Sequence, residues 1–155
     1  MTGAMHIRRA TEADVVALAP LFDRYRQFYG QPSDVGAAAD FLAARFAREE
    51  SVVFVAEAPG SRLCGFTQLY PALCSVAMRR YWILYDLFVD PDARGNGVGR
   101  LLMDRGCEHA IATGAQRVDL ETALDNVVAQ SLYESLGFVR ERHFAKYSLS
   151  LPSAS

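Results

Sequence analysis

The residues from Trp82 to Leu102 read WILYDLFVDPDARGNGVGRLL. This stretch opens with an apolar, aromatic-rich run that is typical of a strand and that one acid, Asp86, interrupts. Pro91, between two aspartates, ends the strand, because proline lacks an N–H for the ladder and fixes its own φ. Glycines then stand at alternate positions from 95 to 99, and apolar residues return at helical spacing. The order is therefore strand, glycine-rich loop, helix.

A loop of this kind can bind an anion. Glycines let the backbone turn tightly and approach a ligand closely. The N–H groups of the next helix's first turn, together with the positive end of its dipole, attract negative charge. Arg94 and Arg100 would add charge-assisted hydrogen bonds to a phosphate. The alternative is a glycine-rich turn between strand and helix that binds nothing.

The spacing separates this loop from two common phosphate-binding motifs. A dinucleotide-binding G-x-G-x-x-G motif requires a third glycine where this chain has Arg100. A Walker loop requires Gly-Lys-Ser/Thr, and no lysine lies nearby. The pattern that is present is R-x-x-G-x-G, filled by Arg94, Gly97 and Gly99.

Two motifs in this order resemble one enzyme superfamily. Preceded by the Asp-Leu-Phe-Val strand, the R-x-x-G-x-G loop closely resembles the acetyl-CoA loop of the GNAT N-acetyltransferases. The segment 126–138 resembles their second signature, N-x-x-A-x-x-x-Y-x-x-x-G-F, with Asn126, Ala129, Tyr133, Gly137 and Phe138 all matching. The resemblance covers essentially the whole chain. It implies an α/β fold of GNAT type, with a mixed central β-sheet flanked by helices in a single domain over residues 1–155, and acetyl-CoA as cosubstrate.

The rest of the chain supplies the elements that such a fold requires. Thr11 is expected to cap a first helix that ends near Tyr29 and Gly30, and Asp34 to cap a second. Pro71 is expected to end the strand that begins at Leu63. Further strands are expected at 5–9, 52–56 and 118–122, with a closing pair at 139–140 and 144–151; the helix after the loop is expected to end near Gly114, and Asp125 or Asn126 to cap a last short helix.

Aromatic and apolar residues near the first two helices divide between core and pocket. Tyr25 and Phe28 are assigned to the core, and Tyr29 to the wall of a substrate pocket. The core face of the second helix is expected to comprise Ala38, Phe41, Leu42 and Phe46.

The composition is that of an ordinary soluble globular protein, with 51% hydrophobic and 22% charged residues. A net charge of −2 argues against non-specific binding to nucleic acid or to an anionic membrane, and no apolar run reaches the length of a membrane span. Cys64, Cys74 and Cys107 are far apart in sequence and are expected to be buried, reduced thiols of a cytoplasmic protein. We expect no metal site.

The resemblance implies a role for each motif residue. The main chain of Leu87, Phe88 and Val89 would pair with the pantetheine arm of acetyl-CoA, like an added strand. Asn126 would hydrogen-bond this arm, and Tyr133 would lie at the thioester sulfur and protonate the leaving thiolate. The pyrophosphate would be held by Arg94, Gly95, Asn96, Gly97, Val98, Gly99 and Arg100.

Acetyl transfer to an amine requires a base, since an alkylamine is protonated at neutral pH. Asp86 is the acid nearest the reactive strand and is the candidate base, alone or through a water chain. The growing oxyanion would accept from an N–H of residues 85–89. Tyr29, Tyr85 and Asp86 are the candidates for binding the acceptor. The alternatives are a buried, structural Asp86 tied to backbone or arginine, and a Tyr133 that only packs on a core.

The sequence looks most like the diamine and polyamine acetyltransferase branch, although Tyr85 stands where those enzymes usually carry a glutamate. It is also similar to small dimeric relatives that acetylate amino acids or histone-type lysines, which leaves the acceptor open. We expect an acetyl-CoA-dependent N-acetyltransferase acting on a small primary amine by direct attack in a ternary complex.

We also expect a homodimer, from the similarity to small dimeric relatives and the aromatic stretch from Phe66 to Tyr81. The alternatives are a protein-lysine acetyltransferase, an RNA-directed toxin, which the charge disfavours, and a non-catalytic CoA-binding sensor.

Overall fold

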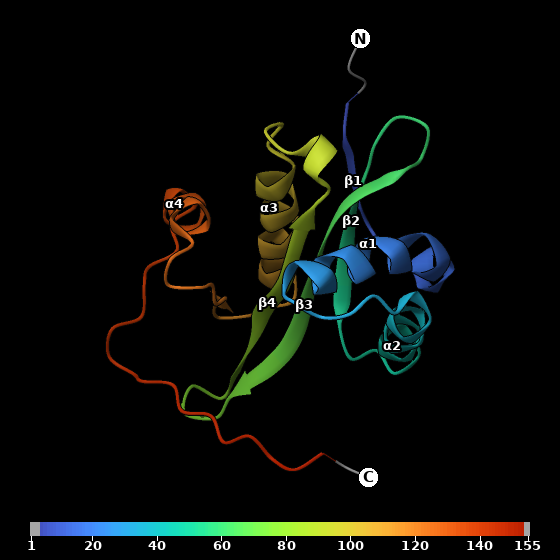
Figure 1. The fold of residues 1–155 in the computed structure, drawn as a ribbon. Coiled ribbons are helices and arrows are strands. Elements are labelled where there is room, and N and C mark those ends of the chain that lie inside the picture. The colour runs from blue at the N-terminus through green and yellow to red at the C-terminus, as the bar shows by residue number, and fades with distance from the viewer. Residues whose placement is uncertain (1–3, 154–155) are drawn as a thin grey trace. The chain divides into compact units, whose positions relative to one another are not determined.

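The computed structural model describes residues 4–153, which form two compact units that divide between Glu121 and Thr122 (Figure 1). The second unit contains one helix, α4 (Val127–Ser135). The elements of the first unit are β1 (His6–Arg9), η1 (Glu12–Asp14), α1 (Val15–Phe28), α2 (Val35–Ala47), β2 (Val52–Glu57), β3 (Leu63–Cys74), β4 (Arg79–Val89), η2 (Pro91–Ala93), α3 (Val98–Ala112) and β5 (Val118–Asp119), where η marks a short 3₁₀ helix.

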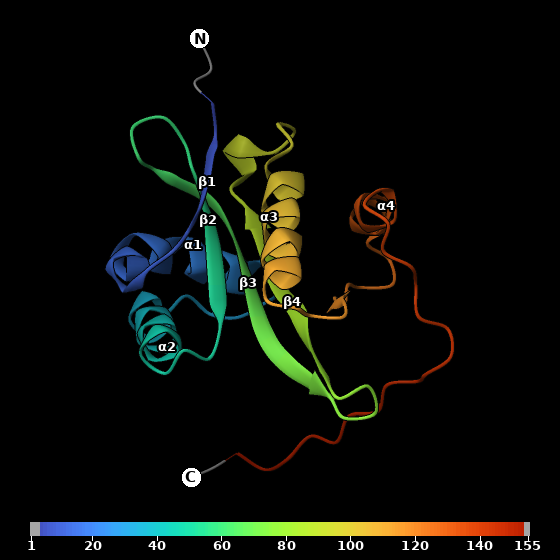
Figure 2. The same ribbon diagram turned by 180° about the vertical axis from the view of Figure 1, so that it is seen from behind.

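The first unit is built on a five-stranded sheet in the order β1-β2-β3-β4-β5. The pairs β1–β2, β2–β3 and β3–β4 are antiparallel, and β5 runs parallel to β4. Helices α1 and α2 cover one face of the sheet and α3 covers the other, as Figures 1 and 2 show from opposite sides. This arrangement confirms the predicted mixed sheet flanked by helices. No helix in residues 4–153 combines the length and apolarity that a membrane span requires.

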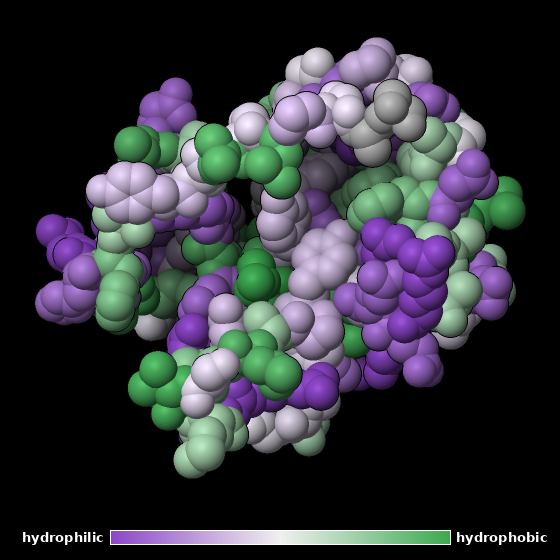
Figure 3. Space-filling view, turned by 90° about the horizontal axis from the view of Figure 1, so that it is seen from below, coloured by the Kyte–Doolittle hydropathy of each residue, from purple (hydrophilic) through white to green (hydrophobic). Residues whose placement is uncertain are grey.

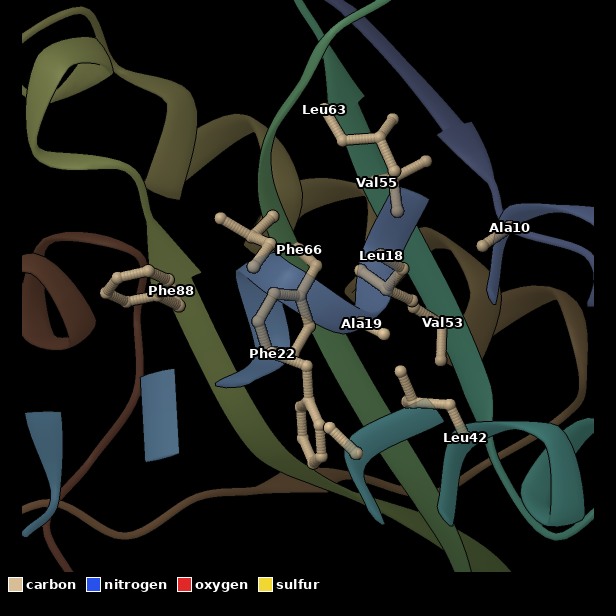
Figure 4. Close-up of a cluster of buried hydrophobic side chains, with 12 residues drawn as sticks. Ala10, Leu18, Ala19, Phe22, Leu42, Val53, Val55, Leu63, Phe66 and Phe88 are labelled. Atoms are coloured by element: carbon tan, nitrogen blue, oxygen red, sulfur yellow. The ribbon is translucent and has the colours of Figure 1, made fainter. Parts of the chain in front are cut away.

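The core between α1, α2 and the sheet fixes the strands that carry the candidate site. Leu18 and Leu42 project from the two helices toward Val55 and Phe66 of the sheet (Figure 4), and all four side chains are fully buried. Each such side chain stabilises the fold by roughly 1.5–3 kcal/mol relative to exposure. Phe22 packs edge-on against Phe66, with 5.8 Å between the ring centroids. The aromatic contacts tie α1 to β3 beside the candidate site.

The predicted helix boundaries are confirmed where a local hydrogen bond sets them. The Thr11 backbone N–H donates to the Asp14 carboxylate at 2.8 Å, before α1 begins. Asp34 accepts from the Ala37 N–H at 3.0 Å and caps α2. Gly114, with a φ of +74°, follows the C-cap of α3. These signals lie within a few residues of the feature that they specify, which is why the sequence reveals them.

The prediction that Pro71 ends its strand is wrong. β3 runs on to Cys74 and pairs with β4 from Gly65 to Cys74, with Pro71 opposite Trp82. The last residue of β3 that pairs with β2 is Leu69. Beyond it β3 is an edge strand with a single neighbour, and an edge strand tolerates the missing N–H of proline.

The strands expected near the end of the chain differ from prediction. β5 is confined to two residues, Val118 and Asp119, rather than extending to residue 122. Residues 139–140 and 144–151 form no strand, and Val139, Phe144 and Tyr147 are more than four-fifths exposed. Their sequence favours extended backbone, but a strand also requires a partner edge, and these residues have no ladder partner in the described chain.

Two aromatic residues assigned to the core are exposed. Phe28, the last residue of α1, is 66% exposed, and its ring contacts Tyr29 rather than the core. Phe41 lies at the rim of the core, stacked on Phe22 and covered by the Arg45 guanidinium.

The cysteine prediction holds only in part: all three thiols are free, with Cys64 buried but Cys74 and Cys107 half-buried.

Candidate active site

The pairing of β3 with β4 changes register beside Asp86, a buried acid of β4. Gln68 pairs with Asp86, but the next residue of β3, Leu69, pairs with Leu84. Tyr85 is therefore an extra residue on β4, a β-bulge, and bulges commonly re-aim side chains next to active sites. Its ring is 66% exposed, while the adjacent Asp86 is 5% exposed. The bulge thus lies at two of the three residues that the sequence assigned to the acceptor.

Neutral hydrogen-bond donors surround Asp86. The Gln68 side-chain Nε2 donates to Asp86 Oδ2 at 2.8 Å, and the Thr67 hydroxyl donates to the Asp86 backbone carbonyl at 2.8 Å. The Tyr25 hydroxyl is a second hydrogen-bond donor to the carboxylate. Burial raises the pKa of Asp86, and the bonds from Gln68 and Tyr25 offset only part of this effect. A carboxyl group with a raised pKa and a neutral setting is suited to accept a proton.

Tyrosines line the surroundings of this carboxylate. Tyr70 and Tyr85 pack edge to face with ring centroids 5.5 Å apart, and Tyr25 packs against Tyr29 at 5.2 Å. Burial and then the charge of Asp86 raise the pKa of Tyr25, and the same two causes raise the pKa of Tyr70 to about 12. The hydroxyls of Tyr25 and Tyr70 therefore stay protonated at neutral pH. The exposed Tyr29 and Tyr85 give this aromatic cluster an outer rim.

Sequence reasoning missed four residues of this cluster: Tyr25, which it assigned to the core, Thr67, Gln68 and Tyr70. A signal for two of them was present. Thr67 and Gln68 are polar residues within an apolar strand, and both are fully buried. Buried polar side chains require partners, so their positions in the sequence pointed to a polar site on the neighbouring strand.

The glycine loop leads into a helix that no side chain caps. Gly97 is the N-cap of α3 and has a φ of +74°, a conformation that glycine adopts without strain. Gly95 is also left-handed, and Gly99 and Arg100 lie in the first turn of α3. The N–H groups of this turn, at the positive end of the helix dipole, suit an anion such as a pyrophosphate.

Other loop side chains hold the loop itself. The Arg94 Nε donates to the Val89 carbonyl at 2.9 Å, and its guanidinium lies over the Phe88 ring, 5.5 Å from the centroid. Asn96 Nδ2 donates to the Ala93 carbonyl at 3.2 Å. Val98 is buried, so only its main chain faces the loop. The loop therefore offers an anion chiefly its backbone.

Within residues 4–153, no strand pairs with the second edge of β4 near the loop. β5 pairs with β4 only at Trp82 and Ile83. From Leu84 to Val89, no strand of the first unit pairs with that edge, while β3 pairs with the other. Residues 87–89, predicted to pair with an extended ligand, lie on this stretch. The ring of Phe88 is buried, so this residue would contribute through its main chain.

The second unit contains the other predicted residues. Asn126 is the N-cap of α4, where its Oδ1 accepts from the Ala129 N–H at 3.1 Å. Tyr133 is half-buried on the same helix, with its ring centroid 6.2 Å from that of Phe138. Gly137, with a φ of +95°, follows the end of α4. The predicted residues thus form one set around Asp86 and the loop and another on α4.

Residues 17–138 match the acetyltransferase (GNAT) family. The chain belongs to this family. It is 45% identical to an uncharacterized N-acetyltransferase, YhfO, of Bacillus subtilis over 149 residues, which cover 96% of this chain and 99% of that protein. It is 31% identical to a probable acetyltransferase of Haemophilus influenzae, with 95% and 99% covered.

A solved structure supports the same assignment. The crystal structure of a probable acetyltransferase superimposes on this GNAT protein with a TM-score of 0.91 and 40% identity, covering 96% of this chain and 99% of that one. The predicted GNAT fold is therefore confirmed, and the protein is a GNAT N-acetyltransferase. The assignment of particular residues to acceptor and cosubstrate goes beyond these likenesses.

Proposed function

We propose that this protein transfers the acetyl group of acetyl-CoA to the primary amine of a small molecule of the amino acid, diamine or polyamine type, by direct attack in a ternary complex. One observation carries the proposal. Strand β4 contains a buried carboxylate with neutral partners, and η2 and the glycine loop lead from the end of this strand to the uncapped start of α3. A proton acceptor and an anion site therefore lie on one strand–loop–helix segment.

The residues present suit acetyl-CoA as cosubstrate. The backbone of residues 95–100 would hold the pyrophosphate, because the turn before α3 lacks a side-chain cap and Gly97 carries no Cβ. The main chain of Leu87 and Phe88 would pair with the pantetheine arm along the open edge of β4. The Val89 carbonyl already accepts a hydrogen bond from Arg94, so we expect the Val89 main chain to contribute less to binding of the pantetheine arm. Asn126 retains its Nδ2 as a donor while its Oδ1 caps α4.

Asp86 would remove the proton that makes the acceptor amine nucleophilic. An amine arriving as its ammonium ion meets a buried carboxylate with neutral partners, which favours the cation electrostatically. Loss of one proton to Asp86 frees the nitrogen lone pair to attack the thioester carbonyl. The new C–N bond forms to give a tetrahedral oxyanion, whose collapse breaks the C–S bond, and the thiolate leaves with a proton that we assign to the Tyr133 hydroxyl. The second proton that the nitrogen loses passes to water, from which Tyr133 regains its own. A backbone N–H beside the Tyr85 bulge would stabilise the oxyanion.

The acceptor enters beside the tyrosine cluster in this proposal. Tyr29 and Tyr85 would contact its carbon skeleton, while Asp86 holds its nitrogen. Because rings of tyrosine attract cations, this setting suits an alkylammonium group. A diamine or polyamine acceptor would follow from the resemblance to that branch, and Tyr85 in place of a second acid suits an acceptor with fewer positive charges.

Binding of acetyl-CoA can be tested by calorimetric titration of Gly97→Glu. A glutamate at the N-terminus of α3 is strained at positive φ and repels phosphate, so we expect affinity to fall by at least tenfold. Gly114→Glu is the matched control, because Gly114 has the same φ of +74°, has open space around its Cα, and lies at the other end of α3. The helix of 15 residues separates the two sites by about 22 Å. Equal losses of affinity in the two variants would refute the loop assignment.

We also propose that the protein forms a homodimer. Leu73, Val76 and Met78, around the β3–β4 turn, are 75%, 97% and 90% exposed, and a group of exposed apolar side chains can mark a protein–protein interface. Figure 3 views the molecule from the end where this turn lies and shows hydrophobic residues among hydrophilic ones. Sedimentation velocity at micromolar concentration should show a species of twice 17.1 kDa, which Val76→Asp weakens. A monomer alone would contradict this proposal.

Residence of the protein in the cytoplasm stays a prediction.

A further inference from the structure

A line of hydrogen bonds runs from the residue before β2, through β3, to Asp86 on β4. Ser51, which immediately precedes β2, donates its hydroxyl to Gln68 Oε1 on β3 at 2.8 Å. The other end of the same amide donates through Nε2 to Asp86 Oδ2 on β4, also at 2.8 Å. Gln68 is fully buried and Asp86 is 5% exposed. Both ends of the buried amide are therefore satisfied.

The order of donors and acceptors in this line has one solution when Asp86 is ionised. A carboxylate only accepts, so the amide nitrogen of Gln68 must face it. The amide oxygen then faces Ser51, and the serine hydroxyl must donate. Without Ser51 this buried amide oxygen would lose its donor, which is costly inside the protein. Ser51 thus stabilises the orientation of Gln68 that favours the charged form of Asp86.

We propose that Gln68 is a positioning residue that aims the Asp86 carboxylate and keeps it ionised for proton removal, with Ser51 supplying the hydrogen bond that the Gln68 amide oxygen requires. The proposal rests on the proposed role of Asp86 as the base. It assigns a function to an amide buried inside a β-strand, where an apolar side chain would pack at lower cost in desolvation. Because burial raises the pKa of Asp86 and Gln68 lowers it, loss of Gln68 raises this pKa further.

The test is Gln68→Met, which preserves the length of the side chain and removes its donor. A hydrogen bond to a charged group contributes about 1.5–3 kcal/mol. On the acid side of the pH profile, kcat/KM should therefore fall by roughly tenfold to a hundredfold. At high pH, where Asp86 is ionised in both proteins, kcat/KM should return toward the wild-type value. Ser51→Ala should move the profile in the same direction by less, and Ser51→Thr, which retains the hydroxyl, should restore it.

The carboxyl carbon of Asp86, followed by NMR against pH, gives a readout independent of turnover. An upward shift of its titration in Gln68→Met, matched by the same shift in the acid limb of kcat/KM, supports the proposal. An unchanged Asp86 titration overturns it. A loss of activity equal at all pH values also overturns it, because that is the result of a structural role alone. A shifted titration with an unshifted acid limb instead removes Asp86 as the base, and so overturns the role proposed for it above.

Discussion

Tyr133→Phe is expected to lower kcat by roughly 10²-fold, the lower end of the 10²–10⁴ range for one general acid. The lower end is expected because a thiolate, whose thiol has a pKa of about 8.5, is already a fair leaving group. The substitution retains the ring beside Phe138 and removes only the hydroxyl. Affinity for acetyl-CoA and the melting temperature should therefore change little. Pre-steady-state and steady-state rates on one preparation measure the effect.

Tyr147→Phe is the matched control for this variant. Tyr147 is 92% exposed and lies in the same unit of the chain, so loss of its hydroxyl should leave kcat unchanged. If Tyr133→Phe turns over an acceptor at the wild-type rate while chemistry limits turnover, Tyr133 is not the acid, and the alternative of a packed helix tyrosine holds.

Asp86→Asn should lower kcat/KM by 10²–10⁴ for an alkylamine, because the variant lacks the group that takes the proton. Asparagine has the shape of aspartate and can still accept from Gln68, so we expect the fold to persist. The acid limb of the pH profile should disappear together with the titration of Asp86. Steady-state kinetics from acid to alkaline pH, with the melting temperature as a check on folding, measure both effects.

A second acceptor separates proton removal from binding in the Asp86→Asn experiment. An amine with a pKa well below the assay pH is already neutral and requires no base. The loss caused by Asp86→Asn should shrink greatly for such an acceptor if Asp86 acts as the base. A loss of equal size for both acceptors would contradict the base role and leave Asp86 as a binding or structural group.

The features that the sequence predicted well depend on residues close together in the chain. The glycine loop, the start of α3 at Val98 and the caps at Asp34 and Asn126 each follow from a few adjacent residues. The buried state of Asp86 was foreseen as an alternative, but the expected arginine or backbone tie is a glutamine and a tyrosine instead. The local sequence therefore located the motifs, but it did not reveal which residues from other strands and helices contact them.

The features that the sequence did not reveal depend on pairing between strands. The bulge at Tyr85 exists only because β3 and β4 change register there, and the Gln68–Asp86 bond joins residues that are 18 positions apart. Pro71 continues a strand because the pairing of β3 with β2 does not extend past Leu69. Strand propensity at 144–151 likewise gave no strand, since propensity does not supply a partner edge. Each of these outcomes depends on tertiary structure.

Release of free CoA thiol from acetyl-CoA, measured over a panel of small amines, amino acids and basic peptides, tests the proposed function most directly. We expect at least one small primary amine to accelerate thiol release far above hydrolysis, with one acetyl group found on the amine for each thiol. Release that only lysine-containing peptides accelerate would contradict the small-molecule acceptor. Tight binding of acetyl-CoA with no acceleration by any member of the panel would contradict the catalytic account and favour a CoA-binding sensor.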